Sequence, residues 1–346
     1  MEGISVVRVW TLISSNDGFL LRILDYMSFM ISAIAAAIFQ KRPDIVVGTS
    51  PQFFTICAAR AVGFLIRRPW VLELRDFWPE SIKAVGAMRD TVALRLMERL
   101  ERHLYDKADH IIVVAESFER ILADRGVDRR KISVVTNGVD RASFPQLDGS
   151  PLRALHGLEG KFVVGYIGTL GMAHALETVL DAASMIANDP ELNDVRFIFV
   201  GDGARREALV KDAVNRRLGN VIFVPSVPRK RAIEYLSILD ASIVHLRKME
   251  LFEAVIPSKI FECMATGTPI LMGVRGEALE IVAQAGAGIA FEPENPAHLA
   301  SVIRDLRKDP DLAVALGKAG QLAARNFDRD ALAKEMVAKL EQVANK

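Results

Sequence analysis

Short apolar runs alternate with longer stretches of helical periodicity along the whole chain. The short runs predict buried strands at residues 5–9, 45–48, 70–74, 110–114, 132–135, 162–167, 196–200, 221–224, 242–246, 270–272 and 289–291. The longer stretches predict helices, notably at 20–39, 91–105, 176–187, 204–217, 232–239, 278–284, 297–307, 312–327 and 331–343. This alternation is typical of parallel sheets wrapped by helices. The pattern therefore predicts an α/β protein with doubly wound, Rossmann-like sheets.

The pattern restarts once, which predicts two domains. A chain of 346 residues is also longer than one ordinary domain. Asn137-Gly138 predicts a turn at the end of the first half, and residues 144–161, rich in Pro, Gly and charge, predict a linker. We therefore expect domains at 1–150 and 151–346 with a cleft between them. The last helix, 331–343, carries an apolar stripe and is a candidate to pack back on the first domain.

Composition narrows the possible classes of protein. Hydrophobic residues make up 51% of the chain, which is enough for two cores and too much for a disordered protein. The net charge is +1 and no block of Lys or Arg is present, so a charge-driven nucleic-acid partner is not expected. Cys57 and Cys263 imply no disulfide framework and no metal site. With no signal-peptide pattern at Met1-Glu2-Gly3, we expect a cytoplasmic protein.

The longest uncharged run spans residues 26–40. It is too short for a membrane span, which needs about 20 apolar residues. A buried core helix and a helix lying at a membrane interface both fit this run.

The first loop of the second half is a candidate phosphate site. In doubly wound sheets, ligands bind beyond the carboxyl ends of the strands. Gly168, Thr169, Gly171 and His174 follow a predicted strand there, and glycines let a backbone approach a phosphate closely. His174 could donate to an anion or to a sugar hydroxyl. Two residues separate Gly165 from Gly168, where the dinucleotide-binding fingerprint requires one. This spacing argues against a nicotinamide or flavin site. A tight turn without a ligand, with a structural His174, is the alternative.

Two further loops are expected at the same edge of the sheet. Gly201-Asp202-Gly203 follows the next strand and opens a helix, which alone is a weak sign of a ligand. Val227 lies in a loop that Pro225 and Pro228 stiffen, so its carbonyls could recognise a base. Together with the stretch that follows, these loops favour a nucleotide site.

Residues 257–269 predict a short helix with chemistry at its start. Pro257 suits the first turn, and Gly267 suits the end. Ser258 and Lys259 stand at its start, with Glu262 one turn on, and such a helix could hold a phosphate and a ribose. A surface helix with one Lys–Glu pair is the alternative. The apolar face is expected to hold Ile260, Phe261 and Met264.

The first half offers one candidate site, at the loop after residues 70–74. Asp76 could accept a proton from an acceptor hydroxyl, and Arg75 could hold a phosphate. Ser50 ends an earlier strand at the same edge and is a weaker candidate for substrate binding. The alternative is an Arg75–Asp76 ion pair with Trp78 filling the core. No Ser-His-Asp set, metal-ligand cluster or Walker loop is apparent in the sequence.

These residues resemble a known family. Residues 257–269, Pro-Ser-Lys-Ile-Phe-Glu-Cys-Met-Ala-Thr-Gly-Thr-Pro, resemble the donor-binding motif of glycosyltransferase family 4, which has the GT-B fold. The resemblance extends to residues 137–140 and 201–203. Residues 74–81 and 168–174 are similar to a narrower branch of fucosaminyl- and related transferases of bacterial surface polysaccharide assembly. The resemblance covers nearly the whole chain.

The resemblance implies transfer of a sugar from a nucleotide-sugar, expected to be UDP-linked, to an acceptor hydroxyl. It implies retention at the anomeric carbon, no metal and no cofactor. The second domain would hold the nucleotide, with Glu262 on the ribose and with Gly168 and the start of the 257–269 helix facing the diphosphate and sugar. The first domain would take a saccharide, lipid-linked in such pathways. Peripheral contact with the inner face of the cell membrane through residues 26–40 is then expected.

Three features depart from the family pattern. Ala254 stands where the general pattern has a first Glu, with Glu253 adjacent. Thr169 and His174 stand where many members have an Arg and a Lys, and our hypothesis is that Lys259, with His174, replaces those cations. The chain also opens at what resembles a later strand, so the first strand–helix–strand unit is expected to be absent.

Two other functions share this architecture. A GT-B nucleotide-sugar epimerase would use the same donor site without an acceptor. A non-catalytic nucleotide-binding partner in a polysaccharide-assembly complex would bind the donor without turnover.

Overall fold

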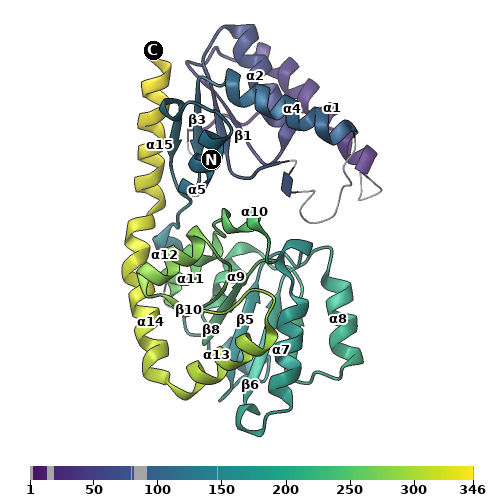
Figure 1. The fold of residues 1–346 in the computed structure, drawn as a ribbon, viewed down its shortest axis with the longest axis vertical. Helices are drawn as coiled ribbons and strands as arrows, with labels where there is room; N and C mark the ends of the chain where they lie inside the picture. The colour runs from purple at the N-terminus through teal and green to yellow at the C-terminus, as the bar shows by residue number, and fades with distance from the viewer. Residues whose placement is uncertain (1–2, 14–18, 79, 82–91, 146, 346) are drawn as a thin grey trace. The chain divides into compact units, whose positions relative to one another are not determined.

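The computed structural model describes residues 3–13, 19–78, 80–81, 92–145 and 147–345 (Figure 1). The chain divides into two compact units, which are described separately. Unit 1 comprises Met1–Thr136 and Ala333–Lys346, and unit 2 comprises Asn137–Leu332. Asn137-Gly138, where the first half was expected to end, is thus where unit 2 begins. The final helix, α15 (Arg329–Ala344), starts in unit 2 and continues into unit 1.

Unit 1 is a parallel sheet with helices between its strands. Its strands are β1 (Val46–Thr49), β2 (Trp70–Leu74), β3 (His110–Val113) and β4 (Ile132–Val134), paired in the order β1-β2-β3-β4. Its helices include α1 (Phe19–Ile38), α2 (Phe53–Ile66), α4 (Val92–Lys107) and α5 (Glu116–Asp124). The strands β2 and β3 are apolar and almost wholly buried, as expected for parallel strands covered on both faces.

The strand expected at residues 5–9 is not formed, so that prediction is wrong. The segment runs as irregular chain with exposed apolar side chains, among them Val6 at 57% and Val7 at 49% exposure. The chain just after it is held by a helix, since the Leu12 N–H donates to Ser28 Oγ of α1 at 2.8 Å. The segment is not paired with β1, the edge strand of the described sheet, so a local apolar pattern alone does not determine strand pairing.

Unit 2 contains a parallel sheet of six strands in the order β10-β9-β8-β5-β6-β7. The strands are β5 (Phe162–Ile167), β6 (Val195–Val200), β7 (Val221–Val224), β8 (Ala241–His245), β9 (Ile270–Gly273) and β10 (Gly288–Ala290). The helices are α6 (Ser150–Leu155), α7 (Glu177–Ala187), α8 (Arg206–Asn215), α9 (Arg229–Leu236), α10 (Glu250–Glu253), α11 (Lys259–Thr266), α12 (Glu277–Ala285), α13 (Pro296–Lys308) and α14 (Pro310–Ala323). Apart from the segment 5–9, every predicted strand is present with ends within one residue of the expected ones.

The strand order of unit 2 reverses at β5, because the chain moves outward to β6 and β7 and then returns to β8 on the other side. Such a reversal opens a crevice at the carboxyl ends of the two central strands. Beneath it, α7 and α13 lie side by side against the sheet (Figure 1), and their apolar faces join Val164, Phe197 and Leu271 in one buried cluster. The core thus fixes the loops after β5 and β8 at one place.

Candidate functional site

Two glycine loops of unit 2 touch backbone to backbone. Gly168, Gly201 and Gly203 have φ angles of 138°, 148° and 154°, which side chains other than glycine rarely allow. A Cβ atom on Gly201 would lie 1.9 Å from the Gly168 carbonyl oxygen, and one on Gly203 would lie 2.6 Å from the Leu170 oxygen. The Leu170 N–H donates to the Asp202 carbonyl at 2.9 Å and ties the loops together. Glycine is therefore required here for packing as well as for conformation.

A hollow of about 220 Å³ opens over these loops, at the carboxyl ends of β5, β6 and β7. It is lined by Ile167, Gly168, Thr169, Val200, Gly201, Asp202, Ser226, Val227 and Ala232. The structure thus brings together four of the predicted binding residues, Gly168, Thr169, Gly201 and Val227. Its volume lies below the ~300–1,000 Å³ of pockets that enclose whole drug-sized ligands. The hollow suits one part of a nucleotide-sugar.

Helix α11 has the predicted form. Ile260, Phe261 and Met264 are fully buried, as the helical periodicity predicted. Gly267 ends the helix in the left-handed conformation, with a φ of 75°. Ser258 is exposed at the N-cap position, where its side chain makes no capping hydrogen bond. Pro257, expected in the first turn, lies before the N-cap instead, because the helix begins at Lys259. The sequence therefore predicted how this helix packs and stops, but placed its start two residues early.

Lys259 lies at the start of α11 against the first glycine loop. Its Nζ atom is 3.6 Å from the centroid of the Tyr166 ring, a cation–π contact. A Cβ atom on Gly168 would lie 2.7 Å from Lys259 Cε, so the lysine covers this glycine closely. Burial lowers the pKa of Lys259 to about 7, although the negative charge of Glu262 opposes that change. A half-desolvated lysine of this kind gains much from an anionic ligand.

His174 and His245 bind each other's backbone where the strand order reverses. His245 Nδ1 donates to the His174 carbonyl at 2.8 Å, and His245 Nε2 accepts the Glu294 N–H at 3.0 Å. His174 Nδ1 donates to the His245 carbonyl at 3.3 Å. Burial, with the Lys259 charge second, lowers the pKa of His174 to about 4. This ring is therefore neutral, with Nε2 as an acceptor.

This tautomer bears on the predicted role of His174. We expected it to donate to an anion or a sugar hydroxyl and to share the cationic role with Lys259. In the structure its proton is on Nδ1, toward the carbonyl, so Nε2 can accept from a sugar hydroxyl. The positive charge at this position rests on Lys259.

Glu262 is half-buried on α11, one turn after Lys259. Burial raises its pKa, while the positive charges of Arg229, Lys259 and Arg329 act in the opposite direction. Ala254, which stands where the family pattern has a Glu, is buried at the end of α10. Glu262, Ser258 and Gly171 are not among the residues that line the hollow.

In unit 1 the candidate residues lie at the loop that follows β2, and a hydroxyl holds the backbone of that loop. Ser50 is 3% exposed, and its hydroxyl accepts the backbone N–H groups of Arg75 at 2.6 Å and Asp76 at 3.1 Å. The guanidinium of Arg75 lies 3.5 Å from Glu73. Burial raises the pKa of Asp76, and a hydrogen bond from Ser81 partly offsets this. Ser50, Arg75 and Asp76 lie close together, as predicted. The Ser50 side chain binds the backbone of the loop.

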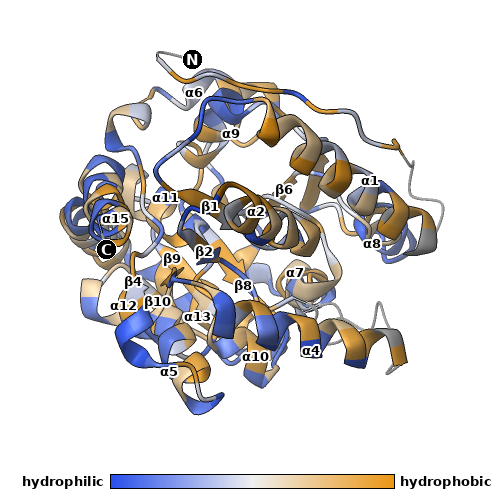
Figure 2. Cartoon of the chain, turned by 90° about the horizontal axis from the view of Figure 1, so that it is seen from above, coloured by the Kyte–Doolittle hydropathy of each residue, from blue (hydrophilic) through white to orange (hydrophobic). Residues whose placement is uncertain are grey.

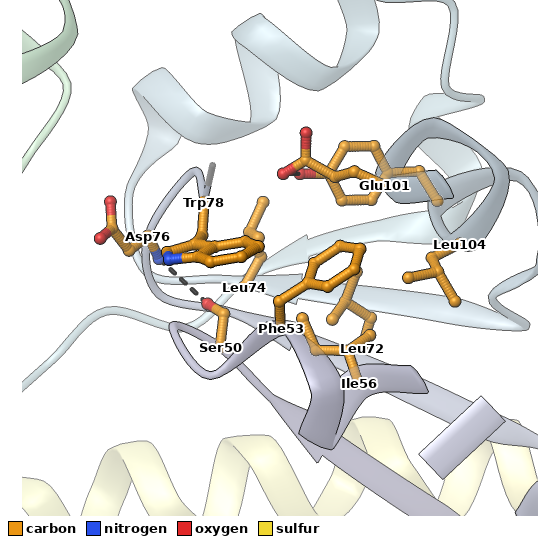
Figure 3. Close-up of a pocket in the computed structure, with 10 residues that line it drawn as sticks. Ser50, Phe53, Ile56, Leu72, Leu74, Asp76, Trp78, Glu101 and Leu104 are labelled. Atoms are coloured by element: carbon orange, nitrogen blue, oxygen red, sulfur yellow. Dashed lines mark hydrogen bonds between the residues drawn. The ribbon is translucent and has the colours of Figure 1, made fainter. Parts of the chain in front are cut away.

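The space beside Asp76 is almost filled (Figure 3). Trp78 stacks on Phe53 with ring centroids 5.0 Å apart, and the remaining hollow of about 10 Å³ has room for about one water molecule. Glu101 faces it from α4 and accepts a hydrogen bond of 2.6 Å from the Tyr105 hydroxyl. Burial raises the pKa of Glu101 to about 8.

Sequence reasoning missed several of these groups. Glu101 and Tyr105 are four residues apart on one helix, and that spacing was the available signal. Tyr166 and His245 lie inside apolar strand runs, where nothing in the sequence distinguishes them from core residues. Among the residues that the structure describes, no three His, Cys, Asp or Glu side chains gather as metal ligands.

Family comparisons address the fold and the site together. The sequence model for "Glycosyl transferases group 1" matches residues 152–323, and that for "Glycosyl transferase 4-like domain" matches residues 1–138. The two matches together span most of both units. The chain belongs to the GT-B glycosyltransferases.

Named relatives agree with this family. The chain is 27% identical over 275 residues to WbjE of Pseudomonas aeruginosa, described as a probable glycosyltransferase, covering 77% of this chain and 66% of WbjE. It is 24% identical over 330 residues to WcaI of Escherichia coli, a glycosyl transferase assigned provisionally to colanic acid biosynthesis, covering 91% of this chain and 79% of WcaI.

Solved structures show the same fold. HepE of Anabaena, in complex with UDP and glucose, matches with a TM-score of 0.74 at 19% identity, over 95% of this chain and 84% of that one. Sucrose-phosphate synthase from Thermosynechococcus elongatus matches with a TM-score of 0.74 at 21% identity, over 92% and 78%. The two parallel-sheet units are those of the GT-B fold.

Proposed function

We propose that this chain is a retaining, metal-independent glycosyltransferase. It moves a sugar from a nucleotide-sugar, UDP-linked, to a hydroxyl of a saccharide acceptor. The observation that carries this proposal is the glycine-lined hollow of unit 2 with Lys259 beside it. A hollow for part of a nucleotide and a partly desolvated cation next to it suit a diphosphate leaving group.

Each residue near the hollow takes a part in this proposal. The base enters between Gly201 and Val227, and the diphosphate lies toward Gly168 and Lys259. As the bond from the sugar to the diphosphate breaks, negative charge grows on the diphosphate, and Lys259 stabilises it. The ligand's charge also returns the pKa of Lys259 toward its ordinary value. His174 Nε2 accepts from a donor-sugar hydroxyl, and Glu262 holds the ribose hydroxyls.

Asp76 of unit 1 is the proposed group that takes the proton of the acceptor hydroxyl. Its pKa is raised by burial, which makes it a better base than an exposed carboxylate. Arg75 and Ser50 serve this loop, Arg75 toward an anionic part of the acceptor and Ser50 by fixing the backbone.

The proposed setting is bacterial surface polysaccharide assembly at the inner face of the cell membrane. The relatives WbjE and WcaI, with the role named for WcaI, support this setting. A lipid-linked saccharide is the proposed acceptor, and the fucosaminyltransferase-like branch remains a prediction. None of the helices within the described residues has the length and apolar character needed to cross a membrane, so peripheral contact is the proposed form of attachment.

Binding of nucleotide-sugars tests the donor site. Ligand-detected NMR on the full chain should find one nucleotide-sugar, and Lys259→Ala should weaken its binding roughly tenfold or more, because hydrogen bonds to charged groups contribute about 1.5–3 kcal/mol. Lys318→Ala, at an exposed position of α14, is the matched control. Unchanged affinity and turnover in Lys259→Ala would refute the role of this lysine.

Products distinguish the proposed transfer from other activities. With donor and a saccharide acceptor, we expect a glycoside that keeps the donor's anomeric configuration. Isomerisation of donor alone would indicate an epimerase instead. Donor binding without transfer to any saccharide acceptor would indicate a non-catalytic partner.

A further inference from the structure

One end of unit 1 combines exposed apolar side chains with a cluster of cations. The C-terminal ends of α1 and α2 meet there, because Arg42 Nη2 donates to the Ile66 carbonyl at 2.6 Å. We call this surface the α1–α2 tip and define it as Ile38, Phe39, Lys41, Arg42, Arg60, Phe64, Leu65, Arg67, Arg68 and Lys107. None of these residues belongs to the candidate sites described above.

The apolar part of the tip is unusually exposed. Phe39 is 85% exposed and Phe64 is 70% exposed, and Ile38 and Leu65 are each 55% exposed. Ile38 and Leu65 line the same hollow, and exposed apolar patches of this kind mark interaction sites. Figure 2 shows hydrophobic residues continuing along α1 and α2.

The exposed side of α1 extends this apolar surface. Leu24, Ile31 and Ile38 are separated by seven residues each, which places them on one face of the helix, and all three are more than half exposed. Met27 lies on the same face and is 37% exposed. This face of α1 is left uncovered by the part of unit 1 that the structure describes, and it continues the apolar surface of the tip.

The cations of the tip surround two adjoining hollows. One, of about 370 Å³, lies between the ends of α1 and α2, and the other, of about 950 Å³, lies between α2, the start of β2 and the end of α4. Leu65 and Arg67 line both. The larger hollow is lined by Arg60, Arg67, Arg68 and Lys107, opposed by the single carboxylate of Asp109.

The charges of the tip are only partly compensated within the protein. Arg68 lies 3.7 Å from Asp44, which is too long for a strong ion pair, and its buried Nε atom has no hydrogen-bond acceptor. Asp109 supplies one negative charge to the larger hollow, and its carboxylate also accepts the Trp70 N–H at 2.8 Å. Arg60 stacks over Phe64 at 5.4 Å from the ring centroid. The tip therefore presents cations whose charges an anionic partner would neutralise.

We propose that the α1–α2 tip docks the protein on an anionic phospholipid surface. The exposed rings and aliphatic side chains enter the headgroup region, and a lipid phosphate occupies the arginine-lined hollow. Exposed apolar side chains beside several Lys and Arg fit a membrane whose headgroups carry phosphate. The inference deepens the peripheral attachment proposed above and rests on it, and it does not depend on transfer activity.

Vesicle flotation without donor or acceptor tests the proposal. The full chain should float with vesicles of phosphatidylcholine and phosphatidylglycerol, and less with phosphatidylcholine alone or at high salt. Arg67→Gln combined with Lys107→Gln should weaken binding roughly twentyfold, because each Lys or Arg near an anionic surface contributes about fivefold. Arg120→Gln combined with Lys334→Gln removes two exposed cations of unit 1 outside the tip, and it should leave binding unchanged.

A second variant tests the apolar part. Phe39→Ser combined with Phe64→Ser changes only strongly exposed rings, so the fold should be kept, and flotation should fall at least about tenfold. If the wild-type chain fails to float, or if both double variants float like it, the proposal is wrong. If light scattering shows a dimer that Phe39→Ser with Phe64→Ser converts to monomer, while no protein floats, the tip is a contact between copies and the proposal is also wrong.

Transfer to a soluble saccharide acceptor separates this inference from the proposed function. The tip variants should keep that transfer while losing flotation. Loss of transfer with normal flotation would refute the proposed function and leave the docking surface standing.

Discussion

The loops at the carboxyl ends of the strands differ between the two units in how far they fill the space above the sheet. In unit 2, three glycines at positive φ let backbones touch, and about 220 Å³ of space remains above them. In unit 1, Trp78 on Phe53 fills the corresponding place, and only about 10 Å³ remains. Glycine at a strand's carboxyl end leaves room for a ligand, whereas aromatic residues there occupy it.

The buried charges at the two edges also behave differently. In each case burial favours the neutral form: it lowers the pKa of Lys259 and raises that of Glu101. Lys259 stands against Gly168, which lines an open hollow, and can be recharged by an anion. Glu101 is closed in with Tyr105, and its neutral form supports the fold. The first arrangement suits binding and the second suits stability.

The largest expected effect tests the glycine contact of unit 2. Gly201→Ala should destabilise unit 2 by about 3 kcal/mol, because its Cβ would overlap the Gly168 oxygen at a strained φ. Thermal unfolding and nucleotide-sugar binding measure the change. Gly219→Ala is the control, since no atom lies within 4 Å of its Cβ position. Equal stability of the two variants would show that the contact is not required.

The next effect tests the buried hydroxyl of unit 1. Ser50→Ala should destabilise unit 1 by about 2 kcal/mol, because two partly buried N–H groups lose the buried hydroxyl that accepts them. Hydrogen exchange at the amides of residues 75 and 76 should rise with it. Ser258→Ala, at an exposed N-cap without a side-chain capping bond, should change stability little. A Ser50→Ala chain as stable as Ser258→Ala would contradict this account.

The raised pKa of Glu101 makes the stability of unit 1 depend on pH. Its pKa in the folded chain, about 8, lies above the ordinary 4.5, so the folded state holds a proton that the unfolded state releases. This contribution is complete below pH 4.5 and is lost as the pH rises through about 8. Glu101→Gln, which keeps a polar group of similar shape, should flatten that part of the stability profile. Hydrogen exchange of α4 amides across this range measures it, and an unchanged slope in the variant would exclude Glu101 as its source.

The smallest effect tests the charge on Lys259. Because the free chain's Lys259 has a pKa of about 7, its positive charge declines as the pH rises above that value. Nucleotide-sugar affinity should fall roughly tenfold or more from about pH 6 to about pH 9, because the bound anion raises the pKa of Lys259 toward its ordinary value. Lys259→Arg keeps its charge throughout and should bind with a flat profile. The same slope in both proteins would assign the pH dependence to another group.

Much of the fold follows from local patterns. Ten strand predictions are confirmed because a buried parallel strand is a nearly continuous apolar run, which the sequence displays directly. The helix α11 was predicted with its apolar face and its Gly267 end, since capping and periodicity are local properties. The strand expected at residues 5–9 was wrong, because a local apolar run does not show which strand, if any, the segment pairs with.

The candidate site was predicted in part. Glycine spacing located the loops of Gly168 and Gly201, and their shared hollow confirms that they come together. The roles proposed for Lys259, Glu262 and Asp76 stay predictions. Three residues were missed: Tyr166, His245 and Glu101. The first two lie in apolar strand runs typical of a core, and Glu101 lies in a helix whose charged positions are typical of a surface.

By itself, the sequence determined where this chain forms strands, helices and glycine turns, since each depends on neighbours a few residues away. Only the tertiary structure decided how the charges behave. The position of Lys259 over Tyr166, the proton on His174 Nδ1 and the burial of Glu101 beside Phe53 and Leu72 all depend on groups far away in the sequence. The physical reason is that secondary structure depends on the local pattern of residues. The free energy of a charged group depends instead on all the surrounding groups that exclude water from it.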